Sequence, residues 1–276
     1  MRKSCCVLAG SLLAAAAASA SAAPANNVAI PDFSGATTGW LAMGTDFKQV
    51  PGAPAMVTND AAHPHVGNGG GKQSSFRFAD LNNPNLTDFA KAGLKQTNEE
   101  VLRGKAVFSR EARCWPTGVP TYDLNQAQPI YFIQTPKEVT IIWQMDHQVR
   151  RVYLDVPHSA NVKPSWYGES VGHYEGDTLV VDTIGQNTKT YVDNYRTPHS
   201  EKLHVTERFH LTNDGKNLQA DIMVEDPATF KQPIKVIQTW RRVTERPMLE
   251  SSCAESGPGF FSFDVEPIPT ANKADF

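Results

Sequence analysis

The sequence is poor in cysteine, in long apolar runs and in excess positive charge. It contains 4 cysteines among 276 residues, and its formal net charge is -3 at pH 7. An acidic chain lacks the basic surface that binds nucleic acid, so we expect no nucleic-acid partner. Beyond the N-terminus, no apolar run approaches the roughly 20 residues that a membrane-spanning helix needs, so we expect no membrane span.

Familiar catalytic and nucleotide-binding motifs are also missing. The sequence has no P-loop, no H-E-x-x-H pair and no C-x-x-C pair. The spacing of its histidines fits no metal template. We therefore expect neither a metal nor an organic cofactor, and only a small-molecule ligand or substrate as partner.

The N-terminus has the three parts of a secretory signal peptide. Arg2 and Lys3 form a short basic region, and an apolar run follows from Cys5 to Ala18. Ala20-Ser21-Ala22 fits the A-x-A cleavage pattern, and the run is too short to cross a bilayer. The pattern predicts a signal peptide over residues 1–23 and a periplasmic or secreted mature protein.

Export changes how the cysteines are interpreted. Cys5 and Cys6 lie in the signal peptide, which leaves Cys114 and Cys253. In an oxidising compartment, two cysteines far apart in sequence most simply form a disulfide. The alternatives are a metal ligand or a reactive thiol, because Arg113 lies beside Cys114 and could lower its pKa.

Residues 24–104 are predicted to be an irregular N-terminal extension with one helix. Residues 24–83 are rich in glycine, proline, asparagine and alanine. Asn85 or Thr87 fits a helix N-cap, and the amphipathic spacing that follows ends near Gly104.

Residues 105–276 are predicted to form a β-barrel domain. About eight segments have the β-branched or alternating composition of strands, and turn signals separate them. No crossover helix lies between them, so we expect a mainly β fold: an antiparallel up-and-down, lipocalin-like barrel, or alternatively a sandwich. The predicted strands lie at 139–143, 149–154, 171–174, 178–181, 203–211, 218–224, 234–243 and 249–253.

One carboxylate stands out in this pattern. Alternation places Glu207 on the same strand face as Val205 and Phe209, and therefore toward the apolar interior. Burial there would raise the pKa of Glu207 and suit it to acid–base catalysis. The alternative is a structural ion pair with an inward arginine, either Arg150 or Arg151.

Several other polar residues gather near predicted strand ends, where a barrel mouth would collect them. His199 and His204 are candidate acid–base groups with Glu207 and Asp182. The candidate substrate-binding residues are Arg151, Tyr153, His158, Trp166 and Lys189. The alternative for each is a solvated loop residue or a buried residue with satisfied hydrogen bonds.

Several segments together resemble a large family of exported bacterial proteins with no established activity. They include Asp32-Phe33-Ser34-Gly35, Cys114 to Pro120, Asp146 to Arg151, Glu175 to Thr183, and Pro198-His199-Ser200 with Leu203 to Phe209. The resemblance implies a lipocalin-like barrel and an exported location, but no chemistry. Gly185-Gln186-Asn187 departs from the Gly-Phe-Asn usual in that family, which implies a different pocket if the aromatic residue lines it.

Two functions follow from these patterns. The first is an exported, cofactor-independent enzyme of the lyase, dehydratase or isomerase type that acts on a small organic molecule, aromatic ones included. The second is a lipocalin-like carrier or sensor of a small apolar ligand. A module that interacts with the cell envelope is a third, less specific alternative.

Overall fold

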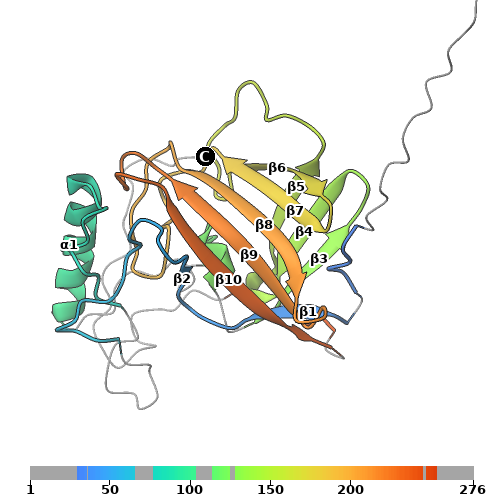
Figure 1. Cartoon of the computed structure of the whole chain (residues 1–276), viewed down its shortest axis with the longest axis horizontal. Helices are drawn as coiled ribbons and strands as arrows, with labels where there is room; N and C mark the ends of the chain where they lie inside the picture. Colours follow the sequence, from blue (N-terminus) through green and yellow to red (C-terminus); the bar gives the residue numbers. More distant parts are fainter. Residues whose placement is uncertain are drawn as a thin grey trace, which may run out of the picture.

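Nine strands close into a barrel in the computed structural model, which describes residues 30–35, 37–65, 77–103, 114–124, 128–244 and 247–253. The ring runs β1-β3-β4-β5-β6-β7-β8-β9-β10 and closes by pairing of β1 with β10 (Figure 1). The strands are β1 (Gly39–Ala42), β3 (Ile130–Gln134), β4 (Glu138–Trp143), β5 (Gln148–Leu154), β6 (Glu169–Glu175), β7 (Thr178–Ile184), β8 (His204–Thr212), β9 (Asn217–Glu225) and β10 (Ile234–Val243). A short strand, β2 (Lys48–Gln49), pairs with β10 at Val236 and Ile237.

Alternation of apolar and polar residues explains why these segments are strands. Every second residue of β9 from Leu218 to Val224 is buried, and the residues between them are partly exposed. The same period holds in β4, β5 and β8. Because alternate side chains of a strand point to opposite faces, each strand gives one set to the barrel interior and one to its outer surface.

The predicted mainly β barrel is confirmed, with three differences. The ring has nine strands, because β1 and β3 join the seven predicted strands that form. β1 comes from the stretch that was expected to be irregular, so the barrel begins before residue 105. The expectation of a wholly antiparallel barrel is wrong at one place, since β5 and β6 are parallel. The strand expected at 249–253 does not form. A closer relation to lipocalins stays a prediction, and the signal peptide lies outside the described residues.

The parallel pair is short. Only Val152–Leu154 of β5 pair with Ser170–Gly172 of β6, whereas β6 and β7 pair along their whole length. The first half of β5 therefore diverges from the chain before β6. This divergence positions the pocket described below.

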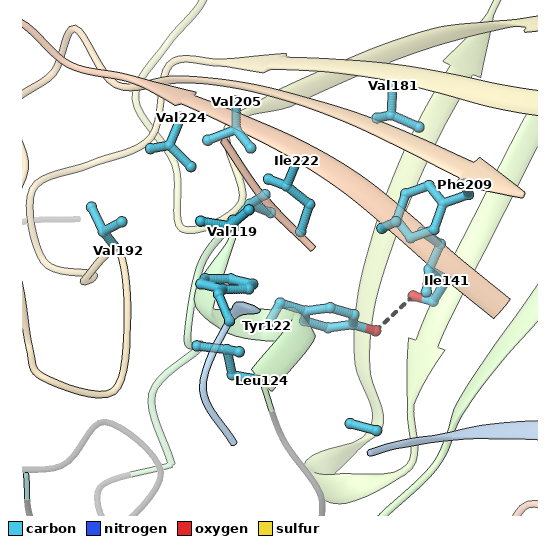
Figure 2. Close-up of a cluster of buried hydrophobic side chains, with 14 of the residues drawn as sticks. Val119, Tyr122, Leu124, Ile141, Val181, Val192, Val205, Phe209, Ile222 and Val224 are labelled. Atoms are coloured by element: carbon cyan, nitrogen blue, oxygen red, sulfur yellow. Dashed lines mark hydrogen bonds between the residues drawn. The ribbon is translucent and has the colours of Figure 1, made fainter. Parts of the chain in front are cut away.

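A turn of 3₁₀ helix, η2 (Thr121–Leu124), lies among the side chains of the barrel interior (Figure 2). The Tyr122 hydroxyl donates a hydrogen bond to the Ile141 carbonyl of β4 (3.3 Å), and Gln238 of β10 donates one to the Asp123 carbonyl (2.8 Å). Large buried side chains, among them Trp143, Trp240 and Phe209, share the same core. The interior is thus occupied by the protein itself.

The helix α1 (Asp88–Leu102) confirms the predicted cap and extent. The Thr87 hydroxyl accepts a hydrogen bond from the Ala90 amide (3.3 Å). Leu94 and Asn98 face inward, and the Asn98 amide pairs with both backbone groups of Ala79. Within the described ranges, no helix has both the length and the apolar character needed to cross a membrane.

Cys114 and Cys253 form the predicted disulfide. The two residues are 139 positions apart, one before η2 and the other after β10. The bond therefore ties the entry to the barrel interior to the chain that leaves the last strand.

Removal of this bond should destabilise the protein strongly. In the chain-entropy model, a loop of this length contributes about 5 kcal/mol to the free energy of unfolding. We expect the double variant Cys114→Ser/Cys253→Ser to lose most of that amount in urea denaturation. A reductant should shift the wild-type midpoint toward that of the variant and leave the variant unchanged. Equal midpoints for wild type and variant would contradict the expectation.

Candidate functional site

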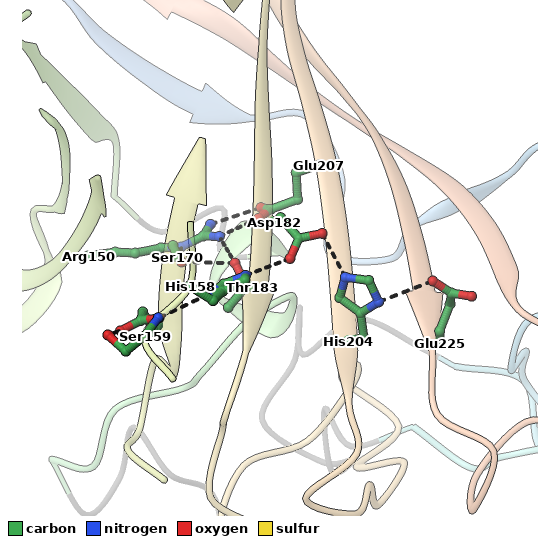
Figure 3. Close-up of polar contacts among 10 residues, drawn as sticks. Arg150, His158, Ser159, Ser170, Asp182, Thr183, His204, Glu207 and Glu225 are labelled. Carbon is green, nitrogen blue, oxygen red and sulfur yellow. Dashed lines mark hydrogen bonds and ion pairs between the residues drawn. The ribbon is translucent and has the colours of Figure 1, made fainter. Parts of the chain in front are cut away.

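A chain of titratable side chains crosses the outer face of the barrel (Figure 3). It runs Glu169–His158–Asp182–His204–Glu225, and we call it the outer chain. His158 Nδ1 lies 3.0 Å from Glu169 Oε1, and His158 Nε2 lies 2.7 Å from Asp182 Oδ1. His204 Nε2 lies 2.7 Å from Asp182 Oδ2, and His204 Nδ1 lies 3.3 Å from Glu225 Oε2. Each histidine thus bridges two carboxylates.

Strand register brings the outer chain together. His204 pairs directly with Glu225 across β8 and β9, and Asp182 pairs with Thr206, two positions from His204. Side chains two positions apart on neighbouring strands are within reach of each other when they are long. His158 comes from the loop between β5 and β6 and joins β6 to β7.

The hydrogen bonds set the charges of the outer chain. The bond from His204 lowers the pKa of Asp182, and the same bond raises the pKa of His204. The Ser159 hydroxyl and amide donate to the Glu169 carboxylate (2.6 and 2.7 Å) and lower its pKa, with a smaller contribution from His158. Asp182 and Glu169 are therefore carboxylates at neutral pH.

A second polar network lies inside the barrel, where Arg150 and Glu207 form a two-pronged ion pair. Arg150 Nη1 donates to Glu207 Oε1 (2.9 Å), and Nη2 donates to Oε2. The arginine also donates to the Thr183 hydroxyl (2.9 Å) and the Ser170 hydroxyl (3.3 Å). Glu207 is 0% exposed and Arg150 is 1% exposed, so each charge is balanced within the core.

Asp123 of η2 lies beside this pair. Burial raises its pKa well above the ordinary value, and the nearby Glu207 carboxylate adds to the rise. This rise in pKa favours the neutral acid form of Asp123, so the Glu207 carboxylate is the group that balances the charge of Arg150.

A pocket of about 350 Å³ opens where β5 and the chain before β6 diverge. It meets the inner network at Arg150 and Ser170, and it meets the outer chain at Glu169. We call it the β5–β6 pocket. Its lining consists of Val149, Arg150, Arg151, Tyr153, Asn161, Val162, Lys163, Tyr167, Gly168, Glu169 and Ser170.

The structure groups some of the predicted site residues and separates others. Asp182, His158 and His204 belong to the outer chain, whereas Arg151 and Tyr153 line the pocket. Glu207 faces the interior as predicted, and Arg150 is its partner. Arg151 instead bonds Glu138 on the outer surface (2.8 Å). The geometry is that of the structural ion pair considered as the alternative.

His199, Trp166 and Lys189 occupy other positions. His199 is buried in the loop between β7 and β8, where its ring nitrogens lie 2.7 Å from Thr190 Oγ1 and 2.9 Å from the Ser200 carbonyl. These contacts fit a role in holding that loop. Lys189 Nζ lies 5.8 Å from the centre of the Trp166 ring, which also contacts Trp115.

Sequence reasoning missed Glu169, Lys163 and Asp123. Glu169 is the first residue of a strand whose inward members, Ser170 and Gly172, are small, so the pattern there is weak. Asp123 lies in the 3₁₀ turn η2, where the two-residue alternation of a strand cannot predict which way its side chain points.

Comparison with models of known protein families and with curated proteins finds no match to this chain. Within the described ranges, no cluster of three or more histidine, cysteine, aspartate or glutamate side chains is arranged to hold a metal ion. The site is therefore interpreted from its own geometry.

Two neighbouring arginines of β5 provide a matched test of the inner network. Arg150→Met leaves the Glu207 and Asp123 carboxyls buried without a cation, so we expect a loss of about 3–5 kcal/mol in the free energy of unfolding. Arg151→Met removes a solvent-exposed partner of Glu138 and should change stability little. Denaturation of both variants in urea measures the difference. Similar losses for both would show that the buried pair has no special role.

The outer chain makes a prediction about His204. The hydrogen bond to Asp182 raises the pKa of His204, so protonated His204 stabilises the fold at pH values below its ordinary pKa, and this is lost as pH rises through the folded-state pKa. In Asp182→Asn, the pKa of His204 should fall toward about 6.5. Proton NMR titration of the histidine ring signals measures this shift. An unchanged His204 pKa in the variant would contradict the assigned contact.

Proposed function

We propose that the protein works outside the cytoplasm and binds a small polar organic molecule in the β5–β6 pocket. The Cys114–Cys253 disulfide supports this location, because such bonds persist in oxidising compartments. The predicted signal peptide and the resemblance to an exported family agree with it. The β5–β6 pocket, with a volume of about 350 Å³, supports a ligand-binding role.

The lining of the pocket favours a polar ligand. A carrier of apolar compounds needs a cavity lined mainly by hydrophobic side chains. Here the lining offers three cationic side chains, a carboxylate, two tyrosines and an asparagine. Large side chains and η2 occupy the barrel interior, where a lipocalin-like carrier would hold its ligand.

We further propose that the bound molecule undergoes an acid–base reaction of the isomerase, dehydratase or lyase type, without a metal or an organic cofactor. Glu169 is the general base, because it lies in the pocket and is ionised. It accepts a proton from the substrate and returns it to another carbon or to the leaving oxygen, while His158 holds the carboxylate in place through its contacts with Glu169 and Asp182. The outer chain, which includes Asp182 and His204, thus supports the base.

Glu207 takes a different role in this proposal from the one expected of it. Its carboxylate is fully buried and occupied by Arg150, so it positions that arginine beside the pocket rather than touching a substrate. His199 similarly holds a loop. The second candidate function is binding without turnover, as in a carrier or sensor. It is favoured by the occupation of both His158 nitrogens, which also suits a purely structural tie between strands.

Two exposed valines test the location of the ligand. Val149 lines the pocket and is 45% exposed, whereas Val156 is 49% exposed and is not part of the lining. Val149→Trp should fill the pocket and abolish binding of small molecules from a metabolite pool, measured by saturation-transfer NMR. Val156→Trp should bind as the wild type does. Absence of any bound molecule, or equal binding by both variants, would refute the proposed site.

Glu169→Gln separates catalysis from binding. The amide keeps the shape of the side chain but cannot accept the proton, so turnover of any converted pool member should fall by about 10²–10⁴-fold while binding persists. Product formation followed by NMR measures this change. A pool member that binds at the pocket and is never converted by the wild type would favour the carrier or sensor instead.

A further inference from the structure

The charges around the β5–β6 pocket indicate what kind of molecule it takes. Arg150, Arg151 and Lys163 line it with positive charge, against the single carboxylate of Glu169. Arg150 is fully occupied by the inner network, and Glu169 is already bonded by Ser159 and His158. Arg151 and Lys163 are therefore the two cations of the lining that can hold an anionic group of a ligand, and Glu169 keeps its role as the proposed base.

These two cations are accessible to a ligand. Arg151 is 59% exposed at its side chain, and it bonds Glu138 through Nε and Nη2 (2.8 and 3.0 Å). Lys163 is exposed, and no ion pair joins it to another side chain of the described chain. A cation without a partner in a pocket attracts an anion, and an arginine beside it adds directed hydrogen bonds.

Aromatic rings form the apolar part of the same lining. Tyr153 is 41% exposed, and its ring centre lies 5.9 Å from the Arg151 guanidinium. Tyr167 contributes a second ring, and Val149 and Val162 add aliphatic surface. A volume of about 350 Å³ accommodates a molecule of roughly one ring with a short side chain.

We infer that the β5–β6 pocket binds a small organic carboxylate with one aromatic ring, its carboxylate held by Lys163 and Arg151. This inference rests on the proposed function and names its ligand class. Repulsion from Glu169 keeps the ligand's own carboxylate away from that residue. The uncharged part of the ligand is then the part that Glu169 meets, which is the orientation that proton abstraction from carbon requires.

Phenylacetate and phenylacetamide test the inference, because they share shape and ring and differ in charge. We expect phenylacetate to bind the full-length protein roughly tenfold more tightly than the amide. Its affinity should fall as salt is added. Lys163→Gln should weaken phenylacetate about three- to fivefold and leave the amide unaffected. Lys235→Gln is the matched control, since Lys235 is an exposed strand lysine of β10 outside the lining.

Titration by NMR or calorimetry gives these affinities. Equal binding of the two probes, binding of neither, or equal effects of the two lysine variants would overturn the inference. The proposed function has its own test. It fails if no metabolite binds, or if Val149→Trp binds metabolites as well as Val156→Trp does. If an uncharged metabolite binds the wild type and not Val149→Trp, the proposed pocket stands and the inference of a carboxylate ligand is refuted.

Discussion

The ion pair between Arg150 and Glu207 is the interaction on which the rest of the barrel depends. Two charges in an apolar core are stable only if every donor and acceptor has a partner, because the desolvation of each ion is costly. Here the partners are Ser170 and Thr183, so the pair joins β5, β6, β7 and β8. Asp123 of η2 lies beside the pair, and burial raises its pKa well above the ordinary value, which favours its neutral form.

The inner network also fixes what lies on the outer surface. Neighbouring residues of a strand point to opposite faces, so fixing Ser170 inward sets Glu169 outward, and fixing Thr183 inward sets Asp182 outward. The outer chain is thus held by the same backbones as the buried pair. Only three residue pairs join β5 to β6, and His158, from the loop between these strands, adds contacts to Glu169 of β6 and Asp182 of β7. The Glu169 carboxylate is held at the pocket by His158 and Ser159.

The sequence predicted correctly those features that depend on a single rule, such as the alternation of side chains along a strand or the state of cysteines in an oxidising compartment. Alternation alone placed Glu207 inside, with Arg150 or Arg151 as its possible partner, and redox compartment alone paired Cys114 with Cys253. Sequence reasoning failed where structure depends on distant segments. β1 is only four residues long and exists because β3 and β10 pair with it on both sides. The meeting of His158 with Glu169 depends on the path of the loop between β5 and β6, which no local pattern encodes.

The same reasoning explains why the pocket lies outside the barrel. A closed ring of this size can hold a ligand, but here η2 and the side chains of Trp40, Trp143 and Trp240 occupy the core. Antiparallel neighbours joined by tight turns leave no gap between them, as in β6 and β7. A parallel pair needs a crossover, and the crossover from β5 to β6 keeps the two chains apart until Val152. The one parallel pair in the ring therefore creates the place where buried charge, outer carboxylates and solvent meet.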